Sequence, residues 1–103
     1  MAFSLKSWTN PRDGAERLYL NGTTRKSVYF ERAHDGRVLW SSKANDTPHK
    51  FQSGDHYGKV RKDREAVLSA ALAFGVTIGG GEEDWARLRL IAETGLMIEE
   101  SAE

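Results

Sequence analysis

Alternating apolar and polar residues in the first 43 positions constrain this chain more than any other feature. Apolar side chains recur at about every second position in four short segments, residues 3–8, 16–22, 27–33 and 37–43. A strand with one buried face has this period. The dipeptides Asn21-Gly22 and Asp35-Gly36 are typical of tight hairpin turns, because both residue types accept a positive φ. The pattern predicts an antiparallel β-meander of three or four strands.

The segment from residue 44 to residue 62 is predicted to be an irregular loop. It contains Pro48 and is rich in Asn, Asp, Ser and Gly, which is the composition of loops. A loop of this length in a small domain is often a binding loop or is disordered. Phe51 and Tyr57 favour order, because we expect aromatic side chains to hold the loop against the core.

Two helices are predicted to follow the loop. The first begins near Asp63, whose carboxylate suits an N-cap, and ends at Gly75. The glycines at residues 79–81 form a joint or tight turn. The second helix starts with three acidic residues from Glu82, which favour the positive end of a helix dipole, and ends at Gly95.

The order of these elements predicts the fold class. Strands followed by helices indicate an α+β fold in which two α-helices pack on one face of the meander. The 103 residues are expected to form one domain, residues 1–98, followed by a frayed acidic tail, residues 99–103. With no cysteine, the chain has neither disulfides nor thiolate metal ligands. The sequence has no signal peptide and no apolar run long enough for a membrane span, so we expect a soluble cytoplasmic protein without a membrane partner.

The charges are unevenly distributed although the net charge is zero. Residues 1–64 carry 13 Lys and Arg against 7 Asp and Glu, whereas residues 65–103 carry 2 against 8. This asymmetry favours a basic binding half, or a homo-oligomer joined through oppositely charged halves. The two halves could equally neutralise each other within one folded domain.

A cluster of basic residues next to the first helix is the strongest functional signal. Phosphate backbones are bound by clustered cations and neighbouring hydrogen-bond donors. The residues predicted to bind nucleic acid are Lys50, His56, Tyr57, Lys59, Arg61, Lys62 and Arg64. Three aromatic residues, Tyr19, Tyr29 and Trp40, are expected to stack bases or form an interface if they lie on an open sheet face. Otherwise they complete the core.

Metal binding and catalysis have weaker support. His49 and His56 lie near Asp46 and Asp55, but their spacing matches no zinc signature. No nucleophile, base and orienting group can be assembled from the sequence. We therefore expect a non-enzymatic binding module without a cofactor or metal.

A protein partner is the alternative to nucleic acid. Interfaces favour Tyr, Trp and Arg, and this chain has 3 Tyr and 3 Trp. Its acidic second helix could cover a basic site on another protein. In this interpretation the chain is an adaptor or inhibitor, for example a phage- or plasmid-encoded protein that blocks a host enzyme.

Overall fold

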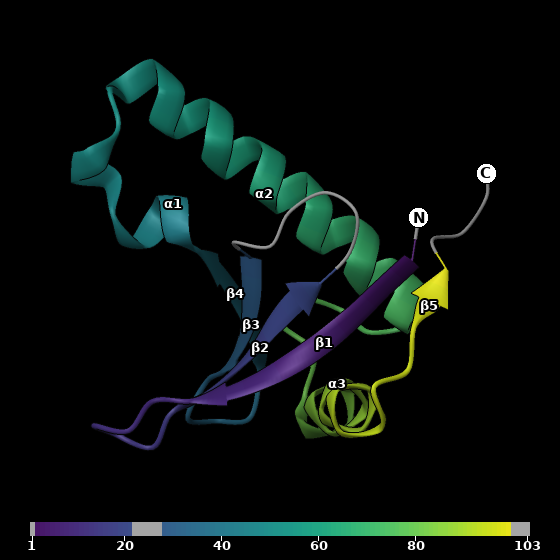
Figure 1. Ribbon diagram of the computed structural model, residues 1–103. Coiled ribbons are helices and arrows are strands. Elements are labelled where there is room, and N and C mark those ends of the chain that lie inside the picture. Colours follow the sequence, from purple (N-terminus) through teal and green to yellow (C-terminus); the bar gives the residue numbers. More distant parts are fainter. Residues whose placement is uncertain (1, 22–27, 100–103) are drawn as a thin grey trace.

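The computed structural model describes residues 2–21 and 28–99 and contains an antiparallel sheet with two long helices (Figure 1). The strands are β1 (Ala2–Thr9), β2 (Glu16–Asn21), β3 (Val28–Arg32), β4 (Val38–Ser42) and β5 (Ile98–Glu99). Their order across the sheet is β4-β3-β2-β1-β5. The predicted meander of four strands is confirmed, and β5 adds a fifth strand at its edge.

The short strand β5 was not predicted, because two residues are too few to show an alternating pattern. Ile98 pairs with Phe3 and Glu99 pairs with Ala2 in antiparallel register. The expected tail therefore starts with a residue that belongs to the sheet. Residues 100–103 lie outside the described part of the chain.

The turn between β3 and β4 is the tight hairpin that Asp35-Gly36 predicted. The Ala33 N–H donates to the Arg37 carbonyl over 2.9 Å, and the Gly36 N–H donates to the Ala33 carbonyl over 2.9 Å. Gly36 has a φ of 89°, which L-residues with a side chain rarely adopt. The Asn21-Gly22 hairpin cannot be compared, because Gly22 lies outside the described residues.

The helices α2 (Ser53–Phe74) and α3 (Glu82–Thr94) both end where glycine predicted. Gly75 and Gly95 follow them with φ values of 74° and 67°, the left-handed conformation of a helix C-cap. The start of α3 at Glu82 is also as predicted. Its acidic first turn complements the helix dipole.

The prediction of a loop over residues 44–62 is wrong. This segment contains most of α1 (Lys43–Asp46), the 3-10 helix η1 (Pro48–Lys50) and the first ten residues of α2. Asp63 is no N-cap, because it lies inside α2 and is completely buried. The sequence hid this part of α2 because residues 54–62 include no fully buried side chain, so they carry no apolar stripe.

Both long helices cover the same face of the sheet, as expected. The register pairs Leu5 with Leu20 and Leu18 with Phe30, so these side chains share one face. The ring of Phe74 lies 6.3 Å from that of Phe30. The buried helix residues packed in this core are Val67, Ala70, Ala71 and Phe74 of α2 and Trp85, Leu88 and Ile91 of α3.

The predicted joint at residues 79–81 is tied to the sheet. The Gly79 N–H donates to the Val38 carbonyl over 2.7 Å, and the Val38 N–H donates to the Gly80 carbonyl over 2.8 Å. These two hydrogen bonds continue the edge of β4. The connection between α2 and α3 is therefore anchored to β4.

Candidate nucleic-acid interface

The predicted basic cluster lies on a helix and not in a loop. Lys50 belongs to η1, and the other six residues, His56, Tyr57, Lys59, Arg61, Lys62 and Arg64, all belong to the first half of α2. We call residues 53–64 the basic arm. The basic arm extends past the sheet, with α1 and η1 beside it (Figure 1). The fold thus brings the predicted residues together on one rigid element.

The four cations of the basic arm are accessible. Lys59, Lys62 and Arg64 are exposed, and the side chain of Arg61 is 82% exposed. Arg61 Nε lies 3.9 Å from Glu65 Oε1, at the outer limit of an ion pair, and the Glu65 side chain is 69% exposed. Such solvent-exposed pairs are weak. Glu65 therefore leaves Arg61 available to another anion.

Phe51 fixes the junction between η1 and the basic arm. Its ring is stacked with the imidazole of His56 at a centroid distance of 6.2 Å. The ammonium of Lys59 lies 5.1 Å from the centroid of the same ring, which is a cation–π distance. Phe51 thus holds this segment, as predicted. Tyr57 does not, because 72% of it is exposed.

The three secondary aromatic residues do not share a face. Tyr19 pairs with Tyr29 in adjacent strands, and both lie on the face opposite the helices. Trp40 pairs with Phe30 and packs against the core, so it lies on the helix-covered face. A stacking surface made of all three residues is therefore excluded by the strand register.

Arg17 occupies the faces of the aromatic residues opposite the helices. Its guanidinium carbon lies 4.4 Å from the centroid of the Tyr29 ring and 5.5 Å from that of Trp8. Its Nη1 also donates a 3.2 Å hydrogen bond to the hydroxyl of Tyr19. Arg17 thus competes with any base for these rings. Sequence reasoning missed this cluster because Trp8 meets Arg17 only through the pairing register of β1 and β2.

Tyr29 has no exposed surface and cannot stack a base. Its hydroxyl donates a hydrogen bond to Asp46 Oδ2. Burial raises the pKa of Tyr29 far above its ordinary value, and the hydrogen bond to Asp46 raises it further. Tyr29 and Asp46 therefore join β3 to α1 and serve the fold.

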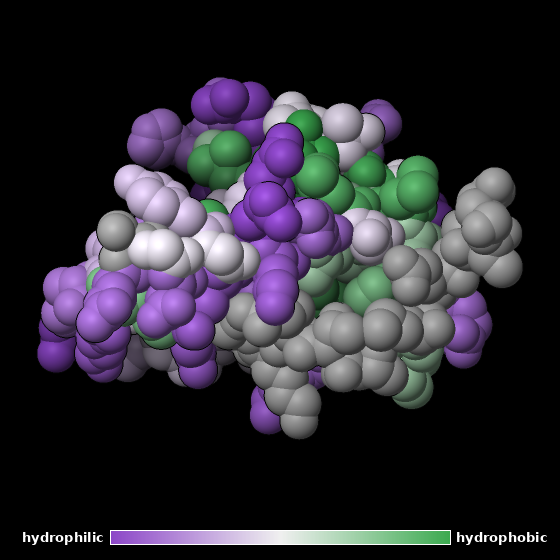
Figure 2. Space-filling model, turned by 90° about the horizontal axis from the view of Figure 1, so that it is seen from above, coloured by the Kyte–Doolittle hydropathy of each residue, from purple (hydrophilic) through white to green (hydrophobic). Residues whose placement is uncertain are grey.

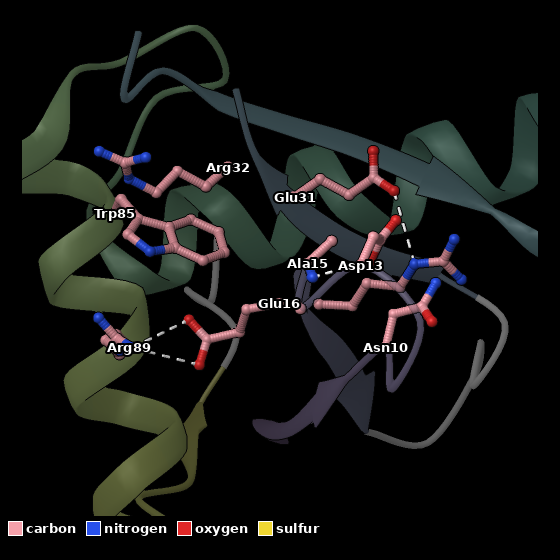
Figure 3. Close-up of a pocket in the computed structure, with 10 residues that line it drawn as sticks. Asn10, Asp13, Ala15, Glu16, Glu31, Arg32, Trp85 and Arg89 are labelled. Atoms are coloured by element: carbon pink, nitrogen blue, oxygen red, sulfur yellow. Dashed lines mark hydrogen bonds and ion pairs between the residues drawn. The ribbon is translucent and has the colours of Figure 1, made fainter. Parts of the chain in front are cut away.

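A hollow of about 610 Å³ lies between the turn at residues 10–15, the ends of β2 and β3, and α3 (Figure 3). Its charged lining residues are Asp13, Glu16, Arg17, Glu31, Arg32 and Arg89. Arg89 Nη2 lies 3.4 Å from Glu16 Oε1, and Arg17 Nε lies 3.6 Å from Glu31 Oε1. Because acids and bases balance here, the hollow does not select an anion as the basic arm can.

Three searches for other kinds of site gave no candidate. Within residues 2–21 and 28–99, no three His, Asp or Glu side chains come together as a metal-binding group. The helices described in that part of the chain are too short or too polar to cross a bilayer. Comparisons with family models, with curated proteins and with solved structures found no match.

Proposed function

We propose that this protein is a non-enzymatic binding module that holds nucleic acid through its phosphate backbone. The basic arm is the binding element in this proposal. The observation that carries it is the exposure of Lys59, Arg61, Lys62 and Arg64 on one projecting helix segment. In this proposal the protein acts in the cytoplasm.

Fixed cations suit a phosphate backbone better than a single small anion. Phosphates repeat along the backbone, and each one contacted by Lys or Arg releases counterions, so affinity depends on the number of cations. A helix keeps its cations at set spacings without a further loss of backbone entropy on binding. Tyr57 adds an exposed hydroxyl to the same arm.

Fluorescence anisotropy with labelled single- and double-stranded DNA and RNA tests the proposal. The test variant is Arg61→Glu/Lys62→Glu. We expect the wild type to bind at low salt and the variant to bind more weakly with a flatter salt dependence, because two phosphate contacts are lost. Equal binding by both proteins would place the site elsewhere. No binding by the wild type at low salt would refute the proposed function.

The matched control changes the same amount of charge away from the basic arm. Arg12 lies in the exposed turn after β1, and Arg37 lies in the hairpin between β3 and β4. The control variant is Arg12→Glu/Arg37→Glu. If binding depended only on the overall charge of the protein, this variant would weaken it as much as the test variant. We expect the control to retain most of the wild-type affinity.

A protein partner is the second candidate, and exposed leucines on α2 favour it. Leu68 and Leu72 are 42% and 72% exposed although they lie on a helix that packs on the core. Seen from above, the surface carries hydrophobic side chains towards the side on which α2 ends (Figure 2). Exposed apolar patches often mark protein-binding surfaces. Loss of partner binding in Leu68→Ser/Leu72→Ser, with nucleic-acid binding unchanged, would support this alternative.

A further inference from the structure

The directions of the side chains on α2 divide the basic arm into two flanks. The buried residues that define the inward side of this helix are Asp63, Val67, Ala70, Ala71 and Phe74. A helix turns by about 100° per residue. The outward side, opposite these residues, therefore carries Gly54 and Gly58.

The four cations lie on either side of this glycine ridge. Arg61 and Arg64 are about 60° apart around the helix axis, and so are Lys59 and Lys62. The midpoints of the two pairs are about 160° apart, each close to a right angle from the outward direction. We call the first pair the arginine flank and the second pair the lysine flank. One row of phosphates in front of the helix cannot face both flanks at once.

We propose that the ligand of the basic arm is duplex DNA, with the arm seated in the major groove and each flank facing the phosphates of one strand. This inference rests on the proposed function and names its substrate class. The major groove of B-DNA is about 12 Å wide and admits an α-helix. Its two walls are phosphate backbones. Cations directed to both sides of a helix match these walls.

Other nucleic acids fit this arrangement less well. The major groove of an A-form RNA duplex is deep and narrow, so a helix cannot enter it. A single strand offers one backbone, which one flank would engage. Single strands are also bound through stacking on aromatic platforms, and Arg17 already covers the aromatic rings of the open sheet face. Duplex DNA is the ligand that uses both flanks.

The glycine ridge allows the helix to approach the floor of a groove closely. A Cβ atom added at Gly54 or Gly58 would meet no other atom within 4 Å, so the fold itself does not require glycine at either position. Glycine within a helix costs about 1 kcal/mol relative to alanine. A helix without side chains on its outward ridge brings its flanking cations nearer the phosphates. It also contacts few base edges, which implies little sequence preference.

Two exposed acids lie near the cations without cancelling them. Asp55 stands in the first turn of α2, and Glu65 follows the last cation of the arm. Glu65 lies 3.9 Å from Arg61 in a weak, solvent-exposed pair. Four accessible cations therefore face two accessible acids, and the arm keeps a positive excess on both flanks.

The test compares the two flanks on matched duplexes. The variants Arg61→Gln/Arg64→Gln and Lys59→Gln/Lys62→Gln remove one flank each and keep residues that favour helices. The probes are duplex DNA, duplex RNA of the same sequence and each single strand. We expect either variant to reduce the slope of log affinity against log salt on duplex DNA by about 1.8, because each flank contacts two phosphates. We expect duplex RNA to bind at least about tenfold more weakly than duplex DNA to the wild type.

The results separate this inference from the proposed function. Salt-sensitive binding in which only one flank matters, or in which RNA or a single strand binds as tightly as duplex DNA, would overturn the major-groove inference and leave the phosphate-binding function standing. The absence of binding to all probes would overturn both. Thermal melting of each variant is the control for folding, and it should match the wild type because all four side chains are exposed.

Discussion

Raising the pH should destabilise this protein through Tyr29. This residue is completely buried and bound to Asp46, and both effects raise its pKa above the model value of 10.0. In the unfolded chain the hydroxyl ionises near that ordinary value, whereas in the folded protein it stays protonated. The unfolded state therefore binds fewer protons above about pH 10, and the free energy of unfolding falls as the pH rises.

The size of the effect follows from proton linkage. One proton difference changes the free energy of unfolding by about 1.4 kcal/mol for each pH unit. Between about pH 9 and about pH 11, Tyr29 alone should remove about 1.4 kcal/mol of stability. The stabilisation is complete below the unfolded pKa and is lost as the pH rises towards the folded pKa.

Urea unfolding at a series of pH values measures this loss. The comparison is between the wild type and Tyr29→Phe, which keeps the ring and removes the hydroxyl. At neutral pH the variant should be less stable by about 2 kcal/mol, because a buried hydrogen bond to a carboxylate is lost. Between about pH 9 and about pH 11, the two stability curves should converge. Tyr57→Phe is the control, since Tyr57 is exposed. Curves for the wild type and Tyr29→Phe that stay parallel would refute the reasoning.

Three further substitutions test the packing. Leu88→Ala should cost about 2–5 kcal/mol, because Leu88 is completely buried, whereas Leu90→Ala on the same helix should change stability by less than about 0.5 kcal/mol, because Leu90 is 59% exposed; equal losses in chemical denaturation would contradict the position of α3. Gly58→Ala should stabilise the protein by about 0.5–1 kcal/mol, since the added methyl group meets open space, and a lower melting temperature would show that the space is filled. Gly36→Ala should destabilise it by about 1–2 kcal/mol, because its φ is 89° and the added Cβ would lie 2.4 Å from Glu82 Cγ; unchanged stability would contradict the hairpin geometry.

The sequence allowed much of the fold to be predicted, because local chemistry determines those parts. Alternating side chains specified β1 to β4, and the glycines at positions 75 and 95 specified where the helices end. The basic arm escaped prediction as a helix. Its residues touch little of the core and include Gly54 and Gly58, so neither periodicity nor helix propensity indicated a helix.

The positions of the aromatic residues depend on long-range pairing and could not be predicted. The alternation within each strand left open which face the helices would cover. The register then placed Trp40 with the core and brought Arg17 onto Tyr29. The basic residues were identified correctly as a group on one segment, but their division into two flanks follows from the helix that carries them.

The salt dependence of duplex DNA binding tests the central claim most directly. We would measure the affinity of the wild type by fluorescence anisotropy from low to moderate salt. If four cations each neutralise one phosphate, the slope of log affinity against log salt should be about −3.6, and affinity should fall about 100-fold between about 50 mM and about 200 mM salt. A slope near zero, or no binding at low salt, would contradict the claim that the basic arm binds a phosphate backbone.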